Sequence, residues 1–137
     1  MKKVFLGGSF QTKDEEDFLR DIYNSFLEEG YEVWWAPVKV GRGYGTKNEK
    51  HRKYIVETEK RELRTSHAAA FVVKKATFGT WGEILDAYEH GIPAVVYVLS
   101  ENSGYSKDFE SAWFAYHVDN IVYKKEDLLQ ELRKILG

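Results

Sequence analysis

Cysteine is absent from this chain of 137 residues, and proline occurs only twice. Without cysteine the chain has no disulfide bond, no thiolate zinc ligand and no cysteine nucleophile. No apolar run approaches the roughly 20 residues that a membrane-spanning helix needs, and the apolar stretch near the amino terminus is too short for a signal peptide. We therefore expect a cytoplasmic protein that does not bind membranes.

A strong net charge and metal-binding patterns are also missing. The formal net charge is -2 at pH 7, which gives no sign of a binder of polymeric nucleic acid. The four histidines show no paired metal-ligand spacing, and neither a Walker pattern nor GxSxG occurs. We expect no metal ion and no cofactor. Phosphoanhydride hydrolysis and serine-hydrolase chemistry have no support.

Hydrophobic residues make up 43% of the chain and aromatic residues 15%, enough for one domain with a substantial core. Short apolar runs alternate with segments of helical periodicity. Strands are expected at residues 4–8, 31–35, 68–73, 93–99 and 120–123, and helices at residues 14–29, 54–66, 82–90, 107–117 and 126–136. This alternation predicts a single-domain, three-layer α/β fold of the flavodoxin-like (Rossmann-like) type, with a five-stranded parallel sheet in the order 2-1-3-4-5.

The most informative segment is Thr77-Phe-Gly-Thr-Trp-Gly-Glu83, which follows the third expected strand. Open α/β sheets bind ligands at the carboxyl ends of their strands, so this segment lies at the expected ligand edge. We expect Glu83 to begin a helix, where the helix dipole keeps its carboxylate ionised and suited to act as a nucleophile. The alternative is an ordinary first-turn glutamate, with glycines that only shape the loop.

Two further groups of residues are expected at the same edge. Gly7 and Gly8 end the first strand and let a ligand approach the backbone, unless they form a plain turn. Hydroxyl groups suited to a phosphate come from Ser9, Thr77, Thr80 and Ser111.

A second carboxylate, Glu59, belongs to the helix before the third strand. Two carboxylates around one sugar are the usual equipment for cleaving a glycosidic bond. Its alternative role is that of a solvated residue in a charge-rich helix.

Three segments together resemble the nucleoside 2-deoxyribosyltransferase superfamily. They are Val4-Phe-Leu-Gly-Gly-Ser-Phe10, the run from Glu59 through Leu63 and Ser66-His67 to Val73, and Gly79-Thr-Trp-Gly-Glu83 continuing to Pro93. The resemblance covers nearly the whole chain, which we interpret as one such domain over residues 1–137. It is strongest to the 2′-deoxynucleoside 5′-phosphate N-hydrolases and the CMP hydrolases.

This resemblance implies roles for particular residues. Glu83 takes the place of the nucleophile that attacks C1′ of the sugar, and Glu59 that of a catalytic helix carboxylate, usually Asp in the family. Thr77 is closer to the Ser of the monophosphate hydrolases than to the Asp of the transferases. Ser111 matches a residue that reaches the neighbouring subunit's site, which implies a homodimer. Substrate contacts are expected at Gly8, Ser9, Phe10, Thr77, Gly79, Trp81, Gly82 and Ser111.

The chain also departs from the family pattern. Phe5 stands where the family has a Tyr whose hydroxyl contacts the nucleophile, and this Phe resembles the ribonucleotide-cleaving members. His67 replaces an Asp before the third strand. Gln11 replaces a basic residue, so Arg42 or Lys47 is expected to serve the phosphate instead.

We therefore expect a nucleotide N-glycosidase that hydrolyses a nucleoside or deoxynucleoside 5′-monophosphate to free base and sugar 5-phosphate through a covalent intermediate on Glu83. Base exchange between nucleosides and a nucleotide-binding module without catalysis are the alternatives. A phosphoribohydrolase of the lysine-decarboxylase-like type is a further alternative, weakened by the missing Pro-Gly-Gly before Gly79.

Overall fold

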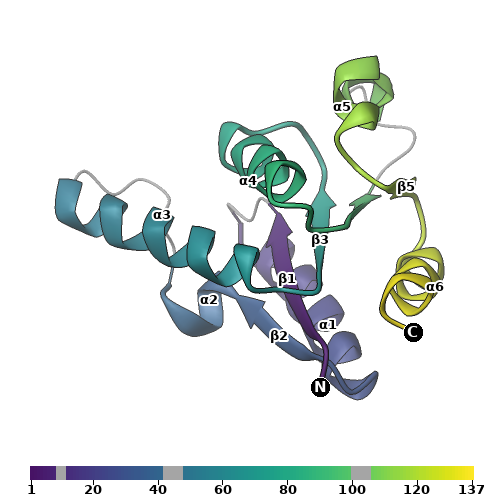
Figure 1. The fold of residues 1–137 in the computed structure, drawn as a ribbon, viewed down its shortest axis with the longest axis horizontal. Coiled ribbons are helices and arrows are strands. Elements are labelled where there is room, and N and C mark those ends of the chain that lie inside the picture. Colours follow the sequence, from purple (N-terminus) through teal and green to yellow (C-terminus); the bar gives the residue numbers. More distant parts are fainter. Residues whose placement is uncertain (9–11, 42–47, 100–105) are drawn as a thin grey trace.

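The computed structural model describes residues 1–8, 12–41, 48–99 and 106–137. Five strands form one parallel sheet in the order β2-β1-β3-β4-β5, which confirms the predicted topology (Figure 1). The strands are β1 (Lys3–Gly8), β2 (Glu32–Trp35), β3 (Ala68–Val73), β4 (Ala94–Val98) and β5 (Asn120–Val122). The helices are α1 (Lys13–Glu28), α2 (Ala36–Lys39), α3 (Glu49–Arg64), α4 (Phe78–Glu89), the short 3₁₀ helix η1 (Ser106–Glu110), α5 (Ala112–Tyr116) and α6 (Lys125–Leu136).

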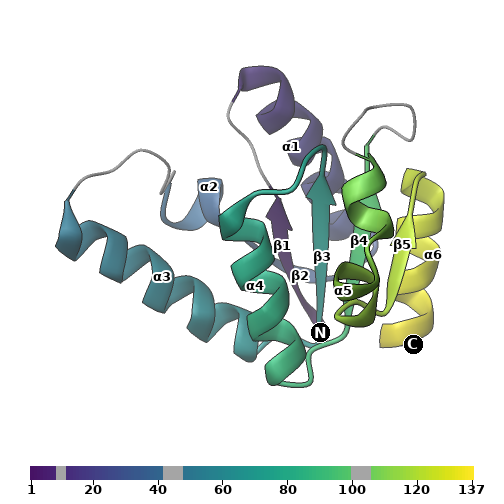
Figure 2. The ribbon, with the colours of Figure 1, turned by 90° about the horizontal axis from the view of Figure 1, so that it is seen from above.

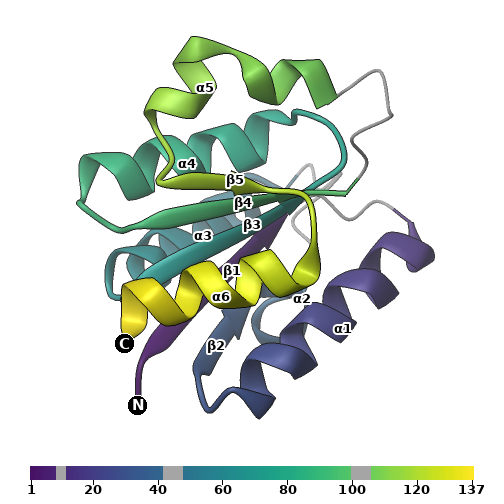
Figure 3. The ribbon, with the colours of Figure 1, turned by 90° about the vertical axis from the view of Figure 1, so that its right-hand side faces the viewer.

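Helices cover both faces of the sheet and give it two separate cores (Figure 3). On one face, α1 and α6 pack on the side chains of alternate strand positions such as Leu6 and Val72. On the other face, α3, α4, η1 and α5 pack on the intervening positions, among them Phe5 and Phe71. Strands covered on both sides are continuously apolar, and β3 is buried at every residue.

The strands β1 and β3 end at the same edge of the sheet, next to the start of α4 (Figure 2). Gly8 pairs with Val72 there and has φ +144°, in the region that favours glycine. A β-carbon on Gly8 would lie 2.2 Å from the carbonyl oxygen of Val72. The glycine at position 8 is therefore required by the backbone itself.

Two helices begin earlier than the sequence predicted. Asn48 caps α3, so this helix begins at Glu49 and not at Tyr54. Thr77 caps α4, because its hydroxyl accepts from the backbone N–H of Thr80 at 3.5 Å, and the helix begins at Phe78 instead of Gly82. Glycine lowers helix propensity without forbidding a helix, and the side-chain caps decide the start.

The expected helix at residues 107–117 is wrong as a single element. It is divided at Ser111 into η1 and α5. Pro37 lies inside α2 near its amino-terminal end, where a proline is tolerated. Within the described ranges, no helix has the length and apolar character needed to cross a bilayer.

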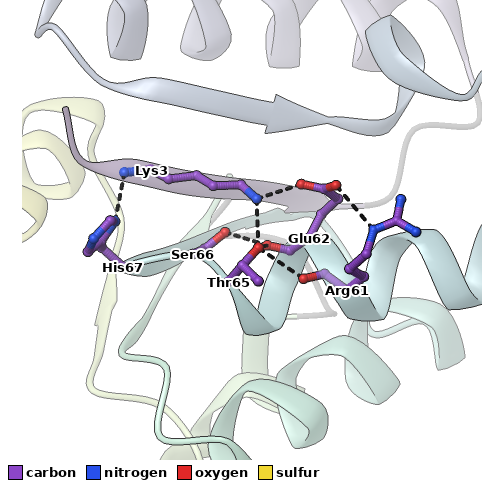
Figure 4. A network of polar contacts seen from close by, with 6 residues as sticks. All are labelled: Lys3, Arg61, Glu62, Thr65, Ser66 and His67. Carbon is purple, nitrogen blue, oxygen red and sulfur yellow. Dashed lines mark hydrogen bonds and ion pairs between the residues drawn. The ribbon is translucent and has the colours of Figure 1, made fainter.

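A polar network anchors the carboxyl end of α3 to β1 (Figure 4). The ammonium group of Lys3 donates to Glu62 at 2.5 Å and to the hydroxyl of Thr65 at 2.8 Å. The backbone N–H of Lys3 donates to Nδ1 of His67 at 3.0 Å, so His67 has a structural role at this end of the sheet. Glu59 lies one turn upstream of Glu62 on the same helix.

We predict that Gly8→Ala lowers the free energy of unfolding by at least about 2 kcal/mol, because the added β-carbon meets backbone at a strained φ. Gly79→Ala is the matched control: a β-carbon there has open space around it and lies in a helix. It should leave stability unchanged or raise it by up to about 1 kcal/mol. Urea unfolding measures both, and equal effects would contradict the assignment.

Candidate active site

A cleft of about 540 Å³ opens at the carboxyl ends of β1 and β3, between α3 and α4. Two acidic side chains line it, Glu59 from α3 and Glu83 from α4, and we call it the carboxylate cleft. Its other described walls come from Phe5, Leu6, Gly7, Gly8, Trp35, Ala36, Ile55, Val56, Lys75, Ala76, Thr77, Phe78, Gly79 and Thr80. The predicted ligand edge is therefore hollow and holds both predicted catalytic carboxylates.

Glu83 does not occupy the position that the sequence predicted for it. Since α4 begins at Phe78, Glu83 lies in the second turn of the helix and not in the first. Its carboxylate points at the first strand: a β-carbon on Gly7 would lie 3.1 Å from Oε2 of Glu83. Glycine at position 7 thus leaves room for the carboxylate against β1.

The two carboxyl groups hold protons more tightly than usual. Burial and then the negative charge of Glu59 raise the pKa of Glu83 well above its ordinary value. Burial raises the pKa of Glu59 to about 7. Burial and repulsion by Glu59 therefore act against the ionised form of Glu83, in the direction opposite to the helix dipole on which the sequence expectation relied.

Packing and one ion pair hold α3 against α4 while these like charges face each other. Leu63 of α3 packs with Ile84 and Ala87 of α4 in the same core. Arg64 donates two hydrogen bonds to the carboxylate of Asp86, at 2.7 and 3.1 Å. The Arg64 hydrogen bonds lower the pKa of Asp86, so this contact is charged and bidentate at neutral pH.

An apolar floor lies beneath the carboxylates. The ring of Phe5 stacks on Trp34 with ring centroids 5.3 Å apart and planes 13° apart, and it is tilted against Phe71 at 6.2 Å. This floor offers no hydroxyl to Glu83. In the part of the chain that the structure describes, neither carboxylate accepts a hydrogen bond from another side chain, which agrees with their raised pKa values.

A second hollow of about 250 Å³, the aromatic cavity, lies on the other side of the amino-terminal turn of α4. The rings of Trp81 and Phe114 stack there at 5.8 Å. Its described walls are Val73, Lys75, Ala76, Thr77, Thr80, Trp81, Ile84, Asp108, Phe109, Ser111, Trp113 and Phe114. The two hollows share Lys75, Ala76, Thr77 and Thr80.

The predicted site residues divide between these hollows. Glu59, Glu83, Gly8, Thr77 and Gly79 line the carboxylate cleft, whereas Trp81 and Ser111 line the aromatic cavity. Gly82 lines a groove of about 400 Å³ between α3 and α4. Ser9 and Phe10, like Gln11, Arg42 and Lys47, lie outside the described residues.

Sequence reasoning missed Lys75, which lines both hollows. In the sequence, two adjacent lysines after a strand are typical of solvated charge. Their environments differ only in the structure, where the chain turns into α4. Among the described residues, no group of three or more His, Cys, Asp or Glu is placed to hold a metal ion.

Comparison with known proteins gives matches in structure alone. No protein-family model and no curated protein matches the chain. A conserved protein from Enterococcus faecalis V583 matches with a TM-score of 0.77 at 14% identity, over 98% of this chain and 98% of that one.

Two further solved structures carry names of enzymes. A 2-deoxyribosyltransferase from Bacillus psychrosaccharolyticus matches with a TM-score of 0.74 at 10% identity, over 92% of this chain and 89% of its own. A CMP N-glycosidase from Clostridium botulinum matches with a TM-score of 0.57 at 18% identity, over 96% and 99%. The fold that the sequence resemblance implied is thereby confirmed over nearly the full length of the chain.

The raised pKa values predict how stability depends on pH. A carboxyl group whose pKa is higher in the folded state than in the unfolded state stabilises the fold fully below the unfolded value. That stability is lost as pH rises through the folded value. For Glu59 the window runs from 4.5 to about 7.

We predict that between pH 4.5 and pH 7.5 the Glu59→Gln variant loses roughly 1–2 kcal/mol less of its free energy of unfolding than the unmodified protein. The figure is discounted for the partial exposure of the Glu59 side chain. Thermal unfolding at pH 4.5 and pH 7.5, followed by circular dichroism, measures the difference. Glu57→Gln, an exposed position on the same helix, is the control and should follow the unmodified protein. If Glu59→Gln and Glu57→Gln show the same pH dependence, burial does not raise the pKa of Glu59 as described.

Proposed function

We propose that this protein hydrolyses the N-glycosidic bond of a nucleoside 5′-monophosphate, releasing free base and sugar 5-phosphate. The observation that carries the proposal is the pairing of Glu59 and Glu83 in one cleft, with the pKa of Glu59 raised to about 7. Glycoside cleavage requires one carboxylic acid and one carboxylate, and two neighbouring carboxyl groups with raised pKa values can hold the proton that this needs.

The first chemical step joins the sugar to the protein. The reaction requires that the proton of Glu83 first passes to Glu59, which leaves Glu83 as the carboxylate and Glu59 as the acid. The carboxylate of Glu83 then attacks C1′, and the bond between C1′ and the base nitrogen breaks, its electron pair leaving with the base. Glu59, in its protonated form, donates a proton to the departing base. Glu83 is half-buried, so its ionised form is stabilised by the positive charge that develops at C1′.

The second step releases the sugar. Glu59, now ionised, takes a proton from a water molecule as the oxygen of that water attacks C1′. The ester bond to Glu83 breaks, and its electron pair returns to the carboxylate. Two displacements at C1′ give overall retention of configuration.

Two kinds of support favour a nucleotide. Thr77, at the rim of both hollows, corresponds to the Ser of the monophosphate hydrolases in the sequence resemblance, and a solved structure of this fold is named as a CMP N-glycosidase. Ser111 lines the aromatic cavity of its own chain. We also propose a homodimer, in which Ser111 reaches the site of the neighbouring subunit, and a cytoplasmic location.

Base exchange is the second candidate function, favoured by the fold shared with a 2-deoxyribosyltransferase. The two reactions share the first step and differ in whether water or a second base attacks the intermediate. Turnover in the presence of a different free base separates them: a new nucleotide product supports exchange, and sugar phosphate alone supports hydrolysis. Tight nucleotide binding with no product of either kind would support a binding module.

We predict that Glu83→Gln lowers base release from nucleoside monophosphates by at least about a thousandfold, because the amide cannot form the glycosyl ester. Chromatography of the released base across the common ribo- and deoxyribonucleotides measures the effect. Glu57→Gln, which lies outside the described lining of the cleft, should retain full activity. Unchanged base release by Glu83→Gln would rule out this residue as the nucleophile.

A further inference from the structure

Lys75 lies at the boundary between the carboxylate cleft and the aromatic cavity. It follows β3 by two residues, is half-buried, and contributes to the walls of both hollows. In the described lining of these two hollows it is the single basic side chain. Its neighbour Lys74 is exposed and lines neither of them.

The charge of Lys75 is not used within the described part of the protein. The ion pairs there join other residues, and Asp108, the acidic residue of the aromatic cavity, does not pair with Lys75. The raised pKa of Glu59 arises from burial, and that of Glu83 from burial and repulsion by Glu59, with no lysine among the causes. A half-buried ammonium group beside a hollow is therefore available to a ligand.

An anionic substrate needs such a group. A phosphate entering the carboxylate cleft meets the negative charge of the Glu59–Glu83 pair, and this repulsion must be offset by a nearby cation. The hydroxyl of Thr77 is already engaged, donating to the hydroxyl of Thr80 at 3.1 Å while it caps α4. Neutral donors alone thus leave the phosphate charge uncompensated.

We propose that Lys75 is the residue that recognises charge on the substrate, binding a phosphate monoester on the sugar whose C1′ lies against Glu83. This inference rests on the proposed function and deepens it, because it assigns the phosphate to the boundary between the two hollows. Arg42 and Lys47, which the sequence analysis expected to serve the phosphate, lie outside the described residues. The substrate class is then nucleoside 5′-monophosphates in preference to free nucleosides.

The test compares Lys75→Met with Lys74→Met, its exposed neighbour, in the full-length protein. Steady-state base release is measured on a matched pair of substrates, a nucleoside 5′-monophosphate and the same nucleoside without phosphate. Lys75→Met should lower kcat/KM for the monophosphate about 10- to 100-fold, mainly through KM, and change the nucleoside less than about threefold. Lys75→Arg should recover part of the loss, and Lys74→Met should change neither substrate.

An equal loss on both substrates, or no loss on the monophosphate, would overturn the role of Lys75. A binding measurement separates this failure from failure of the proposed function. Titration calorimetry with ribose 5-phosphate and with ribose needs no turnover, and Lys75→Met should weaken only the first about tenfold or more. If the unmodified protein releases no base but shows this pattern, the charge recognition stands and the proposed reaction fails.

Discussion

The repulsion between two desolvated carboxyl groups, Glu59 and Glu83, is the constraint on which the rest of this site depends. Isolated in water, each would be ionised at neutral pH. Burial instead raises the pKa of Glu59 to about 7, and burial together with the charge of Glu59 raises that of Glu83. Both carboxyl groups thereby hold protons to higher pH, and the folded state loses stability as the pH rises above the ordinary carboxyl pKa.

Several contacts beside the cleft offset that loss of stability. Arg64 and Asp86 join α3 to α4 through a bidentate ion pair, and Lys3 joins α3 to the first strand through Glu62. Gly7 supplies the space in which the Glu83 carboxylate lies against β1. Glycine, an ion pair and an apolar interface together set where the two carboxylates meet, so these structural residues are part of the site's chemistry.

The topology and both carboxylates could be predicted from the sequence because they follow from regular alternation and from the placement of strand ends. The start of α4 could not, since a threonine cap overrides the glycines that suggested a loop at positions 79 and 82. The raised pKa of Glu83 could not be predicted either, because burial and the nearby charge of Glu59 arise from tertiary packing. Lys75 was missed because the sequence does not distinguish it from Lys74, whereas in the structure only Lys75 lines the two hollows.

The central claim is that Glu83 forms a bond to the sugar. The most direct measurement is intact mass of the protein during reaction with a slowly turning over 2-fluoro-arabino nucleotide, followed by peptide mapping. A mass increase equal to the sugar phosphate without its base, located on the peptide that contains Glu83, is the predicted result. Base release with no adduct and with inverted configuration at C1′ would contradict the account.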